Sequence, residues 1–369
     1  RIYLGGNLSD LSDPHQMKDM DRLVEILAQK IRKQVHIRII GDYDVDGVTS
    51  SHLFLTALRR VGAKVDVVIP HRIQDGYGLS LHLLQQAKED GVDTILTCDN
   101  GIAAIDEIAW AKAQKMTVLV TDHHAVPFEE HEGRRTEKKS LADAVVNPHQ
   151  QDCGYPYKEL CGAGVAWNVI RVLYENYDMD KREAEDLLDF VAMATVCDVM
   201  SLTGENRILV KEGLKRIRHT KNIGLQALMQ ACNVQPENIS AYHFGYVLGP
   251  CVNATGRLDT ARHALRLFET GQETEAEEIA RDLVDLNQER KELTLQGVEM
   301  AKKLCEEGGY ENDPVLVLFL PDVHESIAGL IAGRIREMYN RPVFVLTRGE
   351  EGVKGSGRST ENYSMYENM

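Results

Sequence analysis

The sequence predicts an α/β protein: a parallel-sheet domain with a helical extension, a long connecting helix, and a second, truncated α/β domain. Two observations predict it. Short β-branched runs alternate with helical apolar patterns over residues 35–148, and a helical stretch then precedes a second strand–helix–strand pattern near residue 315. Strands joined by single helices form right-handed crossover units, which build a parallel sheet covered by helices on both faces.

The first domain is expected to contain five strands with helices between them. The expected strands are Val35–Ile40, Lys64–Ile69, Thr94–Cys98, Thr117–Thr121 and Ala144–Val146, all rich in β-branched residues. The expected helices are Thr49–Val61, Leu79–Asp90 and Ala103–Gln114, which have helical apolar spacing. The segment Glu129–Ser140 is charged and lacks an apolar period, so we expect an exposed loop there.

A helical extension and a second domain are expected after this sheet. Helical apolar spacing marks Val165–Tyr177, Lys181–Val196, Asn206–Arg218 and Leu225–Ala231. The charged segment Gly271–Glu307 contains no proline and is typical of a solvated helix that connects domains. The second domain then begins with an expected strand, helix and strand at Val315–Leu320, Ser326–Tyr339 and Val343–Leu346. The expected domain bounds are 1–268, 269–309 and 310–369.

Composition limits the classes of function. The 369 residues are 43% hydrophobic and 27% charged, which is typical of a globular protein with a substantial core. A net charge of -15 excludes a broadly basic, nucleic-acid-coating surface but allows a local basic groove. No apolar run approaches the ~18–20 residues of a membrane span. The seven cysteines include no C-x-x-C pair, so we expect neither a zinc ribbon nor a disulfide framework. Cysteines without disulfides favour a cytoplasmic location.

Acidic and histidine residues follow several of the expected strands. They are Asp42, Asp44 and Asp46 after the first strand, Asp99 after another, and Asp122, His123 and His124 after a third. The carboxyl ends of parallel strands meet at one edge of a sheet, where such folds bind ligands. Oxygen ligands mixed with imidazole suit Mn²⁺, Mg²⁺ or Fe²⁺. The sequence therefore predicts a metal site at this edge.

Simpler explanations exist for parts of this pattern. A single Asp after a strand is often the N-cap of the next helix. The run Asp-x-Asp-x-Asp-Gly also resembles the start of an EF-hand calcium loop, but that loop needs Glu at its twelfth position, and counting from Asp42 gives Leu53. Because acids and histidines recur at successive strand ends, the metal interpretation is favoured.

Several longer motifs resemble those of a known family. GDYDVDG at 41–47, CDNG at 98–101 and DHH at 122–124 resemble motifs I to III of the DHH phosphoesterases. Further similar segments, in the same order, are Tyr155–Val165, Ala194–Leu202, Gly204–Arg207, Gly249–Arg257 and Gly355–Ser359. The resemblance covers nearly the whole chain and is greatest to those members that are 5′-to-3′ exonucleases specific for single-stranded DNA.

The resemblance implies which residues hold metal. The implied ligands are Asp44, Asp46, Asp99, His123 and Asp198, with Asp42 as a further candidate and His124 beside the metals as ligand or transition-state contact. Asp198 has independent support, because it follows an apolar run in which an unpaired carboxylate is costly. The related type II pyrophosphatases carry His four residues before the first Asp of D-x-D; this chain has Ile40 there, which argues against pyrophosphatase activity.

The implied reaction uses two Mn²⁺ or Mg²⁺ ions about 3.5–4 Å apart, which activate a water and clamp the attacking and leaving oxygens of a phosphodiester. Charge that develops on the phosphoryl oxygens calls for cationic donors. Arg257 is the candidate for this role, with Asn253 ordering the loop in which both are expected to lie.

A 5′-exonuclease must also recognise a strand end. Arg72 follows a strand on the same edge of the sheet and can bind phosphate bidentately. Ser356 and Arg358 are expected in a Gly-rich loop whose backbone N–H groups approach an anion. The resemblance puts these three residues around the terminal 5′-phosphate, across the cleft between the domains. It makes His324, at the start of a helix, a further substrate contact.

The resemblance also implies that the chain is a fragment. In the family, the second, DHH-associated domain continues to a Gly-Gly-His motif, and the exonucleases add an oligonucleotide-binding barrel. The implied partners are single-stranded DNA with a 5′ phosphate, a single-strand-binding protein and a helicase, and no membrane. Two alternatives stay open: a phosphodiesterase acting on short oligoribonucleotides or dinucleotides, and a catalytically silent nucleic-acid-binding scaffold, which the complete ligand set disfavours.

Overall fold

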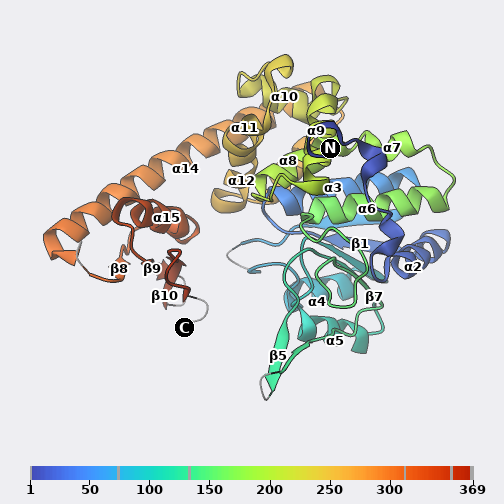
Figure 1. Cartoon of the computed structure of the whole chain (residues 1–369), viewed down its shortest axis with the longest axis horizontal. Helices are drawn as coiled ribbons and strands as arrows, with labels where there is room; N and C mark the ends of the chain where they lie inside the picture. The colour runs from blue at the N-terminus through green and yellow to red at the C-terminus, as the bar shows by residue number, and fades with distance from the viewer. Residues whose placement is uncertain (1, 73–74, 132–133, 311–312, 350–351, 366–369) are drawn as a thin grey trace. The chain divides into compact units, whose positions relative to one another are not determined.

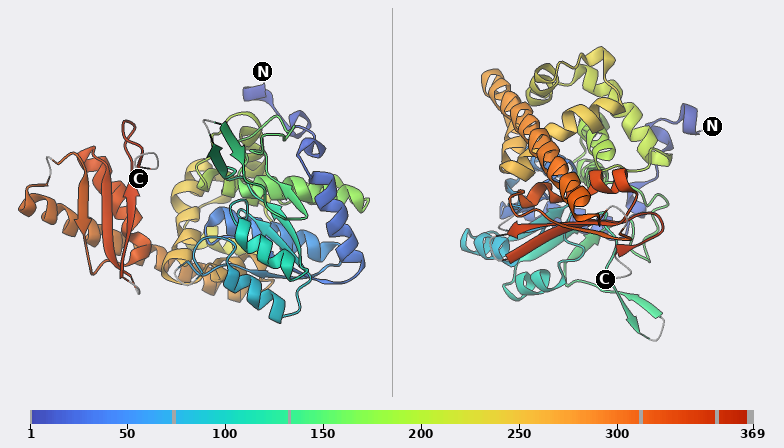
Figure 2. Two further views of the ribbon diagram at one scale, coloured as in Figure 1. Left: turned by 90° about the horizontal axis from the view of Figure 1, so that it is seen from below. Right: turned by 90° about the vertical axis from the view of Figure 1, so that its left-hand side faces the viewer.

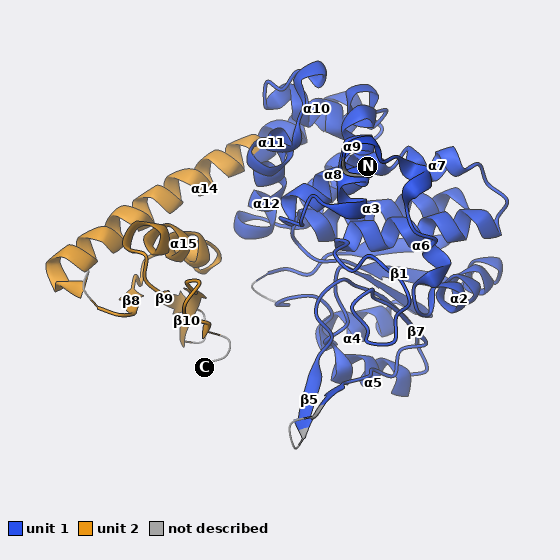
Figure 3. Ribbon diagram, viewed as in Figure 1, with its two compact units in different colours: residues 1–283 blue, residues 284–369 orange. Residues whose placement is uncertain are grey.

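The computed structural model describes residues 2–72, 75–131, 134–310, 313–349 and 352–365. The chain divides into two compact units, residues 1–283 (unit 1) and 284–369 (unit 2), which Figure 3 colours separately. The sequence predicts a separate connecting segment at 269–309. The division instead falls inside the long helix α14 (Glu273–Gly308), so that its start belongs to unit 1 and its remainder to unit 2.

Unit 1 is built around the predicted five-stranded parallel sheet (Figure 1). The strands, in the order in which they pair, are β2 (Lys64–Val68), β1 (His36–Ile40), β3 (Thr94–Cys98), β4 (Thr117–Thr121) and β7 (Ala144–Val146). All four neighbouring pairs are parallel, and the bounds agree with the predicted strands to within one residue. The residues that follow β1, β3 and β4 therefore meet at one edge.

Helices cover both faces of this sheet. The apolar residues of α4 (Leu81–Glu89) and α5 (Ile105–Ala113) join those of the central strands in one buried cluster on one face. On the other face lie α3 (Val45–Arg60) and α6 (Gly162–Asn176) (Figure 1). The N-terminal helix α2 (Met20–Arg32), which the sequence analysis did not predict, packs against α6 and β7.

The helical extension is more divided than the sequence predicts. Its helices are α7 (Lys181–Glu185), α8 (Leu188–Cys197), α9 (Gly204–Arg216), α10 (Ile223–Ala231), α11 (Ala241–His243), the π-helix η5 (Phe244–Leu248), α12 (Gly249–Leu258) and α13 (Ala261–Glu269). The extension also contains the short helices η3 (Ile217–His219) and η4 (Pro236–Asn238). Short helices outside it are α1 (Ile2–Gly5), η1 (Leu8–Asp10), η2 (Pro14–Gln16) and η7 (Glu325–Ile327).

Two predictions for this extension are wrong. The expected single helix Lys181–Val196 is interrupted, because the N–H of Leu187 bonds to the carbonyl of Ala184 in a tighter turn between α7 and α8. Residues 253–257, expected in a loop, lie in α12. Its Pro250 stands in the first turn, where a helix tolerates proline because the N–H there needs no intrahelical partner.

The charged segment 129–140 is also not the expected loop. β5 (Phe128–His131) and β6 (Arg134–Glu137) form an antiparallel hairpin that projects from the rest of unit 1 (Figure 2); residues 132 and 133 lie outside the described residues. The guanidinium of Arg135 lies 3.4 Å from the carboxylate of Glu130 and 4.5 Å from the ring centre of Phe128. Exposed cross-strand contacts hold such a hairpin together, so no apolar period marks it.

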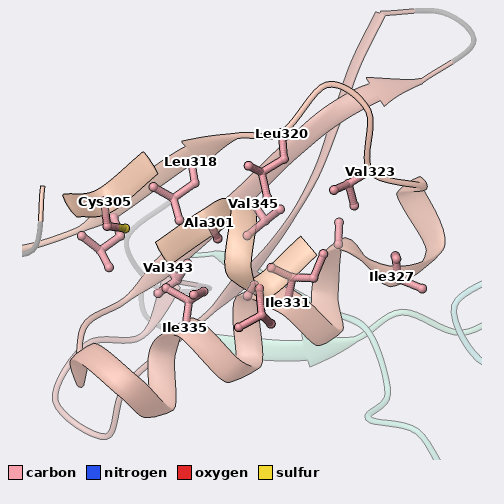
Figure 4. Packing of buried hydrophobic residues seen from close by; sticks show 14 residues of the cluster. Ala301, Cys305, Leu318, Leu320, Val323, Ile327, Ile331, Ile335, Val343 and Val345 are labelled. Atoms are coloured by element: carbon pink, nitrogen blue, oxygen red, sulfur yellow. The ribbon is translucent and has the colours of Figure 1, made fainter. Parts of the chain in front are cut away.

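Unit 2 contains a three-stranded sheet. β8 (Leu316–Phe319) pairs parallel with β9 (Val343–Gly349), and β9 pairs antiparallel with β10 (Gly352–Arg358). α15 (Ala328–Tyr339) and the later part of α14 pack against the sheet, and Figure 4 shows how their apolar side chains interlock with those of the strands. No helix in the described part of the chain is both long and apolar enough to cross a membrane.

Candidate metal centre

The three aspartates after β1 lie on a tight turn into a helix. α3 begins at Val45, four residues earlier than predicted, because Asp44 is its N-cap and accepts the N–H of Gly47 at 3.0 Å. A Cβ added at Gly47 would lie 2.5 Å from the backbone of Asp42, so only glycine fits where the turn folds back on itself. Asp46 is therefore in the first turn of α3 rather than in a loop.

Asp46 is fixed by the start of a second helix. Its two carboxylate oxygens accept the N–H groups of Gly162 and Ala163 at 2.6 and 2.7 Å, at the N-terminus of α6. A helix N-terminus carries partial positive charge and favours a carboxylate. A Cβ at Gly162 would lie 2.6 Å from the Cβ of Asp99, so glycine at this position also lets the end of β3 approach the start of α6. The α6 N-terminus thus locates two acids at once.

Asp99 and His123 meet at the centre of the site. Asp99 has a left-handed backbone (φ +61°), a conformation that costs energy for a non-glycine residue and is often found at functional sites. The Nε2 atom of His123 lies 3.0 Å from Asp99 Oδ1 and 3.6 Å from both Asp46 Oδ2 and Asp198 Oδ2. Asp198 arrives from the C-terminal end of α8.

These side chains form overlapping groups of possible ligands. In each of three groups the donor atoms lie within 4.8 Å of one another: Asp42, Asp44 and Asp99; Asp46, His123 and Asp198; and Asp99, His123 and His124, which shares a residue with each of the others. The buried atoms Asp42 Oδ1, Asp99 Oδ1 and His123 Nε2 make no hydrogen bond within the described structure. Buried polar atoms are nearly always bonded. Carboxylates and one imidazole left in this state fit hard divalent cations.

Burial and repulsion raise the pKa values of these carboxyl groups. The pKa of Asp42 rises to about 8 through burial and the charge of Asp44, and that of Asp198 to about 8 through burial and the charge of Asp46. The pKa values of Asp44 and Asp99 are also raised, first by burial and then by Asp46. Carboxylates crowded in this way are stabilised as anions by a bound cation.

The imidazole of His124 is held by Asp122 and Tyr77, which are not the residues that surround the imidazole of His123. Asp122 accepts the backbone N–H groups of His123 and His124 at 2.7 and 3.0 Å, and its Oδ1 lies 2.8 Å from His124 Nδ1. The hydroxyl of Tyr77 lies 3.0 Å from His124 Nε2. Burial alone would lower the pKa of His124, but the bond to Asp122 outweighs it and the pKa rises to about 9. With 44% of its side chain exposed, His124 is accessible to a substrate.

Helix α12 reaches the aspartate turn. Asn253 Oδ1 accepts the N–H of Val45 at 3.1 Å, which ties α12 to the first residue of α3. A Cβ at Gly256 would lie 2.3 Å from the carbonyl oxygen of Tyr43, so the two backbones touch. Arg257 follows directly, in the last turn of α12.

Arg72 is positioned by an aromatic ring. Its guanidinium carbon lies 4.8 Å from the ring centre of Tyr43, a cation–π contact, and Tyr43 stands between two of the aspartates. Burial raises the pKa of Tyr43, while the charges of Arg72 and Arg257 act to lower it. Both arginines are therefore close to the aspartate turn.

The other three predicted substrate residues lie in unit 2. His324 caps η7, accepting the N–H of Ser326 at 3.4 Å, shortly before α15 begins, as predicted. Arg358 donates to Ser356 Oγ at 3.0 Å. A Cβ at Gly329 would lie 2.7 Å from Arg358 and 2.8 Å from Ser356, so both side chains rest against the first turn of α15.

The prediction of a loop around Ser356 and Arg358 is wrong. Both lie on strand β10, paired with β9. The glycines that suggested a loop serve close packing, since a Cβ at Gly355 would meet Leu346 at 2.4 Å and one at Gly357 would meet Met365 at 2.6 Å.

Unit 1 thus brings together ten predicted residues: Asp42, Asp44, Asp46, Asp99, His123, His124, Asp198, Arg72, Asn253 and Arg257. The sequence analysis named Asp122 only as one of the acids at the strand ends. It did not identify Tyr77, or the N–H groups of Gly162 and Ala163, as positioning groups. A hydrogen bond from a backbone N–H leaves no signal in side-chain chemistry, which is why the last two were not found.

Comparison with known proteins identifies the family. The model of the DHH family, N-terminal domain, matches residues 36–195. The single-stranded-DNA-specific exonuclease RecJ of Haemophilus influenzae is 36% identical over 98% of this chain. A crystal structure of exonuclease RecJ bound to manganese superposes with a TM-score of 0.80, at 32% identity over 95% of this chain and 84% of that one.

RecJ from Thermus thermophilus, crystallised with Mn²⁺, has a TM-score of 0.77 at 31% identity, over 93% of this chain and 47% of that one. The chain spans 64% of the length of the Haemophilus influenzae relative. The chain belongs to the DHH family and, within it, to the RecJ proteins.

Proposed function

We propose that this chain is the core of a metal-dependent 5′-to-3′ exonuclease that hydrolyses phosphodiester bonds of single-stranded DNA, in DNA repair and recombination. The observation that carries the proposal is the buried group of Asp42, Asp99 and His123 atoms without hydrogen bonds in the described residues, beside further carboxylates. The printed names of the relatives, which are single-stranded-DNA-specific exonucleases, support the substrate.

Two Mn²⁺ or Mg²⁺ ions are the proposed cofactors. Asp42, Asp44 and Asp99 would hold one, and Asp46, His123 and Asp198 the other. When bound, the ions would supply a water of lowered pKa and positive charge for the phosphoryl oxygens. The chain's own contribution is orientation: the α6 N-terminus fixes Asp46, and Asp122 fixes the backbone of His123.

Three side chains are proposed to contact the scissile phosphate or support that contact. His124, held by Asp122 and Tyr77, presents an accessible imidazole beside the ligands. Arg257 offers a guanidinium where charge develops on the phosphoryl oxygens. Asn253 keeps α12 against the aspartate turn through Val45 and so sets the position of Arg257.

Recognition of the 5′ end is proposed for Arg72 in unit 1 and for Ser356, Arg358 and His324 in unit 2. Arg72 is held over Tyr43, close to the ligands. Ser356 and Arg358 lie at the first turn of α15, where the backbone N–H groups of the helix start and the helix dipole favour an anion.

If Arg72 binds the terminal phosphate, Arg72→Ala and removal of the 5′ phosphate should each weaken use of that end by about 1–3 kcal/mol, and the two losses should not add. Initial rates on phosphorylated and unphosphorylated strands, with both proteins, measure this. Arg22→Ala, an exposed change on α2, is the control. Fully additive losses would mean that Arg72 acts elsewhere.

The proposed function is tested by Mn²⁺-dependent digestion of a 5′-phosphorylated single strand against the matching duplex, using this chain and a version with a completed second domain. Release of mononucleotides from the 5′ end of the single strand, and its loss in chelator, is expected. Equal digestion of duplex, digestion from the 3′ end, or activity confined to dinucleotides or RNA would contradict the proposal. Binding without hydrolysis in both versions would indicate a scaffold.

Protein partners and location belong to the same proposal. An enzyme restricted to single strands advances on duplex DNA only where the strands are separated, so a helicase and a single-strand-binding protein are the expected partners. None of the seven cysteines, all of which lie in the described residues, forms a disulfide, which fits a reducing cytoplasm.

A further inference from the structure

Unit 1 contains a cavity of about 1000 Å³ that the metal centre does not use. Its walls come from the second half of α3, the start of α8, the loop near residue 221 and the end of α13. This is the upper end of the size range of pockets that bind small molecules.

Two buried polar atoms of the inner wall make no hydrogen bond within the described structure. His52 is 5% exposed and packs against Phe190 and Phe268, with ring centres 4.4 and 5.8 Å away. Its Nδ1 is buried and makes no hydrogen bond within the described structure, and the same is true of Glu269 Oε1. Burial, with a contribution from Arg59, lowers the pKa of His52 to about 3, so the imidazole is neutral and offers one donor and one acceptor.

The lining of the cavity mixes charges: five of the lining residues are Lys or Arg and four are Asp or Glu. Lys215 is paired with Glu212 and Arg216 with Glu185. Arg60 is paired with Glu183 at 2.7 Å and Lys221 with Asp186 at 3.4 Å. The guanidinium of Arg59 is 3.9 Å from Glu269, beyond hydrogen-bond distance, and its side chain is 56% exposed. Arg59 is thus the cation best placed to take up an anionic ligand.

We propose that this cavity binds a guanine nucleoside monophosphate, with the base against His52 and Glu269 and the phosphate against Arg59. Guanine presents N–H donors and the acceptor O6 along one edge. A carboxylate oxygen accepts from the donors, and an imidazole N–H donates to O6. Phe190 and Phe268 line the same wall beside His52 and make it apolar, each with about 2% of its surface exposed.

The cavity and the metal centre share two helices. α3 carries Asp46 near its start and Arg59 near its end, about 20 Å apart at the usual helical rise. α8 carries Phe190 near its start and is followed by Asp198. A nucleotide that contacts both helices can therefore shift the side chains that are proposed to hold the metals. This regulatory effect rests on the proposed function, whereas binding of the nucleotide does not. Nucleoside monophosphates are the product of such an exonuclease, so the cavity would sense product.

The test is calorimetric titration of dGMP into the full chain in chelator, where the metal centre cannot hold the nucleotide through ions. The wild-type chain should bind dGMP at one site. The Arg59→Ala and His52→Ala variants should bind dGMP at least tenfold more weakly. Arg262→Ala, an exposed cation change on α13, and Asp99→Asn, at the metal centre, should bind like wild type. Deoxyguanosine, inorganic phosphate and dCMP should each bind more weakly than dGMP.

Several results would overturn the proposal: no binding of dGMP at millimolar concentration, dCMP binding as tightly as dGMP, or binding lost in Asp99→Asn and kept in Arg59→Ala. The last result would place the nucleotide at the metal centre. If His52→Ala fails to fold, as judged by its melting curve, the surface variant Arg59→Ala decides the matter. Because the titration needs no hydrolysis, an inactive chain that binds dGMP contradicts the proposed function alone.

Discussion

Asp99→Asn should reduce hydrolysis of single strands by about a thousandfold or more, which corresponds to the several kcal/mol that a correctly held metal contributes. The substitution removes the charge of a carboxylate that is grouped with Asp42 and Asp44. The same carboxylate also lies 3.0 Å from Nε2 of His123. Asn tolerates the left-handed backbone of residue 99 better than other side chains, so the fold should persist. His123→Ala should have a similar effect on activity.

Initial rates at saturating Mn²⁺, together with circular dichroism of each variant, measure this effect. Asp106→Asn is a matched control, because Asp106 is exposed on α5 and its carboxylate lies outside the site. It should keep wild-type rates. Substantial activity in Asp99→Asn at high Mn²⁺ would remove Asp99 from the ligand set.

Asp44→Asn should raise the melting temperature in chelator by about 2–4 °C, the shift that 1 kcal/mol produces in a domain of this size. The pKa of Asp44 is raised by burial and by Asp46, so the ionised side chain destabilises the metal-free fold at neutral pH. Asn keeps the N-cap bond to Gly47 and removes the charge.

Saturating Mn²⁺ should reverse this order. At a hundredfold excess over the dissociation constant, metal stabilises wild type by about 2.7 kcal/mol, and Asp44→Asn should lose much of that gain. Melting curves of both proteins with chelator and with Mn²⁺ provide the four values. Asp106→Asn again serves as control. A variant less stable than wild type in chelator would show that the carboxylate of Asp44 stabilises the metal-free fold by more than its burial and repulsion cost.

The sequence predicts the sheet well because the signal is local. β3 and β4 match their predicted bounds, since buried parallel strands are continuous β-branched runs. The hairpin β5–β6 and strand β10 were missed for the opposite reason. Neither buries a regular apolar face, and the glycines of β10 are explained only by side chains that reach them from Leu346 and Met365.

The candidate site divides in the same way. Asp42, Asp99 and His123 could be predicted to meet because parallel strands end at one edge. The apolar run before Asp198 indicated only that this carboxylate needs a partner. That Asp198 and Arg257 join the strand-end residues could be expected only from the family resemblance, since nothing local relates α8 or α12 to the sheet edge. The fixing of Asp46 by two backbone N–H groups could not be predicted, because any residue supplies such a donor.

The bonds from Gly162 and Ala163 to Asp46 join residues 116 and 117 positions apart, and Val45 and Asn253 are separated by 208. A growing polypeptide on the ribosome therefore exposes Asp42, Asp44 and Asp46 long before α6, Asp198 and α12 have been synthesised. A nascent chain of this protein has the acids but not the framework that arranges them. The metal centre is consequently completed late in synthesis, after the helical extension has left the exit tunnel.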